Sequence, residues 1–64
     1  MIRYLNFMKT YRQYKRINQR KLSQMLDVDQ SIISDWETGK ALPPIEVREK
    51  ICEILEIDIQ KVFP

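Results

Sequence analysis

The polar side chains that could recognise another molecule gather between Gln19 and Lys40. A glutamine amide can form two hydrogen bonds with adenine N6 and N7, a carboxylate can accept one from cytosine N4, and a serine hydroxyl can bond to several base edges. These residue types occur together on what would be the exposed face of one short helix, as Gln30, Ser31, Ser34 and Asp35. The pattern therefore predicts hydrogen bonding to bases. For Asp35 an alternative stays open, because an acidic side chain also keeps a helix soluble or repels the phosphates of wrong sites.

Nothing in the sequence points to catalysis, a metal or a cofactor. The chain has no histidine and a single cysteine, Cys52, which leaves too few ligands for a zinc site and no partner for a disulfide within the chain. It has neither a nucleophile paired with a base nor a glycine-rich phosphate loop. With 64 residues, 44% of them hydrophobic, the chain can fill one compact core but cannot enclose a ligand cavity. We therefore expect no enzymatic activity and no small-molecule ligand.

The net charge of +2 is unevenly distributed. Residues 1–26 hold seven of the 11 basic residues and no acidic one, whereas residues 27–64 hold the other four and all nine acidic residues (4 − 9 = −5). This distribution suits a protein that meets a polyanion with one face, although short chains also show such bias by chance. The chain has no run of about 18 apolar residues and no signal peptide, so we expect a cytoplasmic protein without a membrane segment.

Apolar periodicity predicts an all-α fold of five short helices without a strand, in one domain over residues 1–64. The first helix is expected at about residues 6–16, and the second at 19–26 with Asn18 as its N-cap. Asp29 is expected to cap a third helix that ends at about residue 38. A fourth helix should follow Pro44, and Asp58 should cap a last helix at residues 59–63. Asp27 is expected to end the second helix in a left-handed conformation, which glycine adopts more readily.

In each of the first four predicted helices, residues at helical spacing form a stripe along one face. The stripes are Tyr4, Met8, Tyr11 and Lys15; Leu22, Met25 and Leu26; Ile32, Ile33 and Trp36; and Ile45, Ile51, Cys52 and Leu55. Trp36 is interpreted as a core residue that lies on the inner side of its helix with Ile32 or Ile33, and stacking on a nucleic-acid base is the alternative.

From Arg12 to Phe63 the chain resembles the lambda-repressor-like helix-turn-helix domains of the Cro/C1 (XRE) family. The resemblance is carried by Gln19, by the motif IISDWETGK at residues 32–40, by Pro43 and Pro44, and by the closing segment 55–63. Some residues depart from the family pattern: Ser23 takes the place of its small helix residue, Asp27 and Glu56 replace two glycines, and Arg48 replaces a common leucine.

The resemblance implies that DNA phosphates bind around the start of the second helix and after the third. The residues concerned are Asn18, Gln19, Arg20, Lys40, Arg16 and Lys15. A helix N-terminus favours an anion through its free N–H groups and its dipole. Asn18 could instead be a cap only, and Lys15 and Arg16 could be ordinary surface residues. The resemblance also implies a structural ion pair between Arg12 and Glu37.

The implied function is sequence-specific binding of double-stranded DNA by a transcriptional repressor or regulator from a bacterium, phage or mobile element, associated with the nucleoid. The third helix would read the major groove. A homodimer on an inverted repeat is expected, with Ile57, Ile59, Val62 and Phe63 at its interface. Residues 1–7 extend beyond the usual family start and could be dispensable. Two alternatives remain: an antitoxin-type regulator with a toxin partner, and a protein-interaction module without DNA binding, which the acidic Asp27, Asp29 and Asp35 favour.

Overall fold

Five helices make up the fold of residues 3–64, the part of the chain that the computed structural model describes. They are α1 (Met8–Tyr14), α2 (Gln19–Leu26), α3 (Gln30–Glu37), α4 (Ile45–Leu55) and α5 (Ile59–Val62). Within this range there is no strand, so the predicted all-α fold is confirmed. None of these helices combines the length and hydropathy that a membrane crossing requires.

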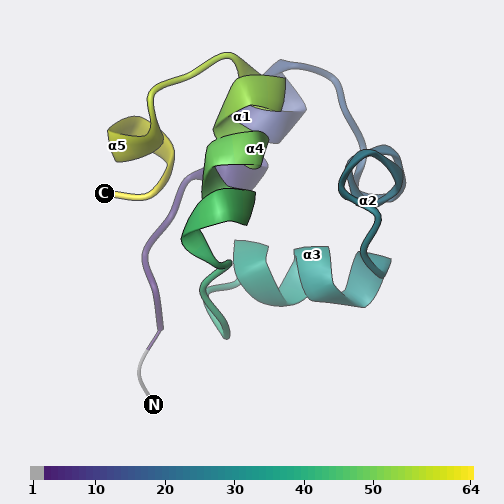
Figure 1. Ribbon diagram of the computed structural model, residues 1–64, viewed down its shortest axis with the longest axis horizontal. Coiled ribbons are helices and arrows are strands. Elements are labelled where there is room, and N and C mark those ends of the chain that lie inside the picture. The colour runs from purple at the N-terminus through teal and green to yellow at the C-terminus, as the bar shows by residue number, and fades with distance from the viewer. Residues whose placement is uncertain (1–2) are drawn as a thin grey trace.

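The helices α2 and α3 form a pair that stands apart from the end of the chain (Figure 1). The α3 helix contacts both α2 and α1, while α5 contacts α4 on the other side of the molecule. One core joins these elements, and its fully buried side chains are Met8, Leu22, Ile33, Ile51, Leu55 and Val62. Cys52 belongs to the same core, and burial, followed by the charge of Asp58, raises the pKa of its thiol.

The helix boundaries follow from local capping groups. The Oδ1 atom of Asn18 accepts a hydrogen bond from the Lys21 N–H at 2.7 Å, and Asp29 Oδ1 accepts one from the Ser31 N–H at 3.1 Å. These caps satisfy backbone donors that a helix start leaves free. The first helix is shorter than predicted because Asn6 Oδ1 accepts the Met8 N–H before the helix begins, and Arg16, at φ 59°, lies beyond its end.

In α2 and α4, two positions of the predicted stripes are exposed. Met25 and Ile45 each expose 47% of their surface. Ile45 is the first residue after the Pro44 N-cap, and the inner face of α4 begins instead with the half-buried Val47, one helical turn before the buried Ile51. In α2 the inner position beside Leu22 is taken by Ser23, whose hydroxyl donates to the Arg20 carbonyl at 2.6 Å.

The segment before α1 is bonded to two parts of the fold. The Tyr4 N–H donates to the Gly39 carbonyl at 2.9 Å, and the Phe7 N–H donates to the Val62 carbonyl at 2.8 Å. Asn6 Nδ2 donates to the Trp36 carbonyl at 2.7 Å. Residues 3–7 are therefore an integral part of the fold and not a loose addition to it, while residues 1–2 of the expected extension lie outside the described range.

The turn between α2 and α3 holds a side chain in an unfavourable backbone conformation. Asp27 has φ 55° and ψ 47°, as expected from its place at the end of α2. We expect Asp27→Gly to raise the free energy of unfolding by a few tenths to about 1 kcal/mol, because glycine adopts this conformation without a Cβ penalty but has more entropy to lose on folding. Urea unfolding measures the change. A stabilisation of the same size by Asp27→Ala would contradict this explanation.

Candidate nucleic-acid interface

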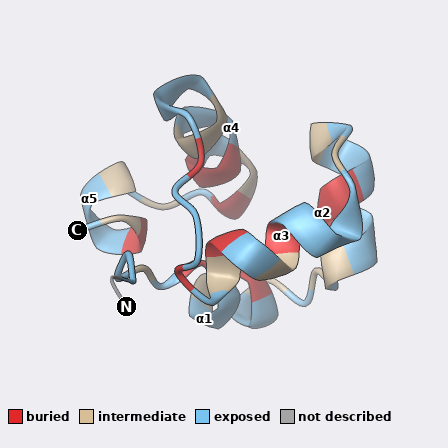
Figure 2. Cartoon of the chain, turned by 90° about the horizontal axis from the view of Figure 1, so that it is seen from below, coloured by how far each residue is buried: buried red, intermediate tan, exposed pale blue. Residues whose placement is uncertain are grey.

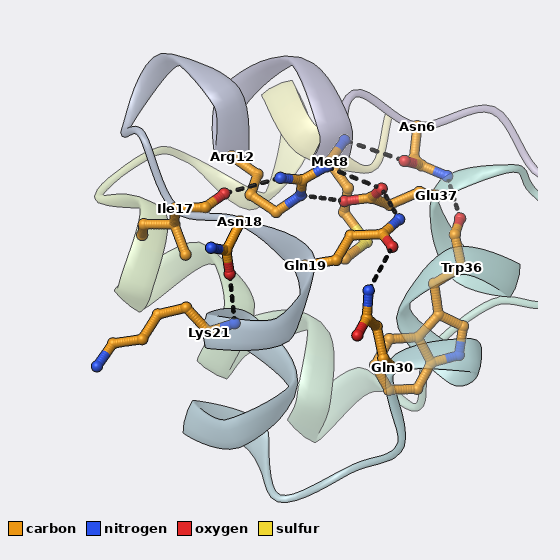
Figure 3. A network of polar contacts seen from close by, with 10 residues as sticks. All are labelled: Asn6, Met8, Arg12, Ile17, Asn18, Gln19, Lys21, Gln30, Trp36 and Glu37. Carbon is orange, nitrogen blue, oxygen red and sulfur yellow. Dashed lines mark hydrogen bonds and ion pairs between the residues drawn. The ribbon is translucent and has the colours of Figure 1, made fainter.

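A buried ion pair links α1 to the end of α3. Arg12 Nε lies 2.5 Å from Glu37 Oε2, and the two side chains are 7% and 2% exposed. Arg12 Nη2 also donates to Glu37 Oε1 at 3.3 Å, and Nη1 donates to the Ile17 carbonyl at 2.7 Å. Arg12 thus fixes the C-terminal end of α3 and the connection that enters α2 (Figure 3).

The same carboxylate extends this contact to the surface of the domain. Gln19 Nε2 donates to Glu37 Oε1 at 2.8 Å, and Gln30 Nε2 donates to Gln19 Oε1 at 3.3 Å. Because a carboxylate only accepts hydrogen bonds, Glu37 determines which way the Gln19 amide points, and Gln19 in turn presents its oxygen to Gln30. The four side chains form a continuous polar chain from the core to the first turn of α3 (Figure 3).

This polar chain changes the expected role of Gln19. Its side chain is half-buried and both its amide atoms are bonded to other side chains, so it is mainly a bridge and not a free clamp. One amide hydrogen and the backbone N–H at the start of α2 are what it can offer to a phosphate. Its contact with DNA phosphate stays a prediction.

Much of the outer face of α3 is exposed (Figure 2), and the residues predicted to read bases belong to this helix. Gln30, Ser31 and Asp35 are exposed, while Ser34 is half-buried. The Ser31 hydroxyl already donates to Asp29 Oδ1 at 3.2 Å, which leaves its oxygen as an acceptor.

Ile32 is an exposed apolar residue on this face, and the sequence left open whether Ile32 or Ile33 lies on the inner side of the helix with Trp36. It is 39% exposed, whereas its neighbour Ile33 is fully buried. Adjacent residues on a helix point about 100° apart, so only one of the two can share the inner face with Trp36. An exposed isoleucine here could contact a thymine methyl group, as apolar side chains do in the major groove.

The basic residues differ in whether their charge is available to bind a phosphate. Arg16, Arg20 and Lys40 are exposed, as is Asn18 with its side-chain oxygen committed to the cap. Lys15 is different because its Nζ lies 3.1 Å from Glu56 Oε1, a contact that joins α1 to the end of α4. This pairing favours the alternative of Lys15 as an ordinary surface residue.

The expected interface residues near the C-terminus are mostly packed inward. Val62 is fully buried, so the expectation that its side chain contacts a second copy is wrong: the short α5 turns Val62 into the core. Ile57, Ile59 and Phe63 are half-buried and pack against that core, which leaves each of them part of its surface.

The comparisons with known proteins agree with this geometry. Residues 8–62 match a family model described as helix-turn-helix. The chain belongs to the Cro/C1-type helix-turn-helix family. It is also similar to the crystal structure of a protein from Bacteroides fragilis for which DNA binding is suggested, with 26% identity over 91% of this chain and 94% of that chain and a TM-score of 0.85. No curated protein matches this chain. The family consists of DNA-binding regulatory domains and not of enzymes.

The buried ion pair predicts a strong energetic coupling. Arg12→Ala and Glu37→Ala should each lower the melting temperature markedly, because the remaining partner keeps an uncompensated buried charge, at a cost of about 3–5 kcal/mol. The double variant should lose clearly less than the sum of the single losses in thermal unfolding.

The exposed pair of Lys15 and Glu56 is the matched control for this cycle. Its alanine variants should be additive to within about 1 kcal/mol, because surface ion pairs contribute little. Additive losses for Arg12 and Glu37 as well would show that their contact has no energetic weight.

Proposed function

We propose that this protein binds double-stranded DNA sequence-specifically with α3 in the major groove and acts as a transcriptional repressor or regulator in the cytoplasm. The observation that carries the proposal is the polar chain from Arg12 to Gln30, which ends at an exposed amide in the first turn of α3. The first turn of a recognition helix is the part that meets base edges in such domains.

Gln30 is the principal candidate for base reading. With one Nε2 hydrogen directed to Gln19 Oε1, the Gln30 amide keeps its oxygen and a second hydrogen free, which are the acceptor and donor that pair with adenine N6 and N7. Ser31, Ser34 and Asp35 would read neighbouring base pairs, and Ile32 would contact a thymine methyl group.

Affinity would come from phosphate contacts on both sides of this helix. Asn18, Gln19 and Arg20 surround the start of α2, where an anion is favoured, and Lys40 follows α3. Arg16 lies just before α2 and is exposed. Each phosphate neutralised by a cation would add about 0.9 to the slope of log binding constant against log salt concentration.

One short helix reads only a few base pairs, so we propose that two copies bind an inverted repeat. The half-buried Phe63, Ile57 and Ile59 supply the partly exposed apolar surface near α5 that a second copy would cover. The dimer would be weak in solution and firm on DNA, with recognition helices about 34 Å apart.

A second candidate function is supported by the acidic residues around α3. Asp27, Asp29 and Asp35 are all exposed, and carboxylates repel phosphate at close range. They would suit a domain that binds a protein, such as an antitoxin-type regulator with a toxin partner or a module without DNA binding. Salt-dependent binding to duplex DNA distinguishes the two candidates.

Base reading by Gln30 has a direct test. Gln30→Ala should weaken binding to a cognate duplex by about 1–3 kcal/mol and leave binding to a scrambled duplex nearly unchanged. Fluorescence anisotropy with both duplexes measures the two values. Gln60→Ala, an exposed glutamine on α5, is the matched control and should change neither. Equal losses of Gln30→Ala on both duplexes would mean that Gln30 reads no base.

The proposed dimer surface is tested by introducing a negative charge at Phe63. Phe63→Asp should reduce cooperative binding to a full inverted repeat while half-site binding and the circular dichroism spectrum stay unchanged. Ile45→Asp places the same charge on an exposed apolar residue of α4 and serves as the control. Unchanged full-site binding by Phe63→Asp would assign the dimer to another surface, and its unfolding would assign Phe63 to the core.

A further inference from the structure

The N-terminal segment ends beside the last turn of α3, although it lies outside the family match over residues 8–62. Figure 1 shows it running from α1 past α5 toward the connection between α3 and α4. Two hydrogen bonds fix this course, from Tyr4 N to the Gly39 carbonyl and from Asn6 Nδ2 to the Trp36 carbonyl. The contacts that this segment makes with the end of α3 therefore involve residues outside the part of the chain that matches the family.

Gly39 allows the two backbones to approach closely. It has φ +82°, and a Cβ built on it would lie 2.6 Å from the Tyr4 carbonyl oxygen. Any other residue would push the segment away from α3. The position of residues 3–6 is thus set by backbone packing as well as by side-chain hydrogen bonds.

This packing holds Arg3 at the C-terminal cap of α3. Arg3 Nη1 donates to the carbonyl of Thr38, the C-cap residue, at 2.9 Å. The rest of the guanidinium keeps its N–H donors free, because Arg3 is exposed and makes no other side-chain hydrogen bond or ion pair within residues 3–64. Its orientation is fixed by the Thr38 bond, while its charge remains available.

A second cation lies at the same end of the helix. Since Tyr4 is bonded to Gly39, Arg3 and Lys40 are the residues that flank this contact on the two segments. Lys40 is exposed and has no ion-pair partner among the described residues. Two cations that lack acidic partners and share one end of a helix are suited to a phosphate, which a guanidinium binds through two parallel hydrogen bonds.

The length of α3 indicates where that phosphate would be. Eight residues span roughly 12 Å along a helix axis, and the major groove is about 12 Å wide. If the first turn of α3 reaches base edges, its last turn lies near the sugar–phosphate backbone that borders the groove. This step rests on the proposed function of α3.

We propose that Arg3 is a DNA-contacting residue that binds a backbone phosphate together with Lys40, so that the N-terminal segment extends the interface beyond the family domain. A purely structural alternative is that Arg3 only neutralises the negative end of the α3 dipole. The two roles differ in one observable: a phosphate contact releases counterions on binding and a cap does not.

The test uses the full chain and a duplex that the wild-type protein selects from a random pool. The binding constant is measured by fluorescence anisotropy over a series of salt concentrations. Arg3→Gln keeps an N–H donor for Thr38 but removes the charge, and Arg3→Lys keeps the charge. Lys40→Gln is the positive comparison, and Lys61→Gln, an exposed cation on α5, is the matched control for loss of charge.

We expect Arg3→Gln and Lys40→Gln each to lower the magnitude of the salt slope by about 0.9. Arg3→Lys should restore the slope, and Lys61→Gln should leave it unchanged, with melting temperatures close to wild type throughout. If Arg3→Gln keeps the wild-type slope while Lys40→Gln reduces it, the proposed role of Arg3 is overturned and the proposed function of the domain stands. Failure of the wild-type protein to select any duplex would overturn the proposed function together with it.

Discussion

The pair of Arg12 and Glu37 is the contact on which the orientation of α3 depends. Removing two charges from water costs several kcal/mol per ion, and their attraction offsets this cost only when the geometry is good and the remaining hydrogen-bonding atoms are satisfied. Here the Ile17 carbonyl and the Gln19 amide supply the additional partners. The pair therefore acts less as a source of stability than as a fixed point, because its bonds tie α1 to the end of α3 and to the start of α2.

The orientation that this ion pair fixes is transmitted to the surface of the domain through hydrogen bonds. Glu37 directs the Gln19 amide, and Gln19 directs the amide of Gln30. If Gln30 reads a base as proposed, an amide that is already oriented would lose less freedom on binding than a free glutamine side chain, so less of its hydrogen-bond energy would be offset by lost entropy. At the other end of α3, Gly39 and the N-terminal segment hold Arg3 in place. In the proposed function, both ends of the helix are thus oriented for contact before DNA binds.

The sequence predicted the elements that local signals determine. Asn18 and Asp29 defined the starts of α2 and α3, and Asp27 was placed correctly in its left-handed conformation. Periodicity alone could not decide between Ile32 and Ile33, because the choice depends on how α3 rotates against the core. Val62 was assigned to a dimer surface because apolar residues near the C-terminus looked too many for a small core, but α5 turns it inward. The contacts that tie residues 3–7 to the end of α3 join positions 30 or more residues apart, and no local pattern encodes them.

Selection of bound duplexes from a random pool, at low and at moderate salt, is the direct test of sequence-specific DNA binding by α3. We expect enrichment of an inverted repeat whose half-sites are centred about one helical turn apart, with an adenine at the base pair that Gln30 reads. Affinity should fall as salt rises while the enriched sequence stays the same. No enrichment at either salt concentration would contradict sequence-specific DNA binding, and would favour a helix-turn-helix domain whose exposed α3 binds another protein.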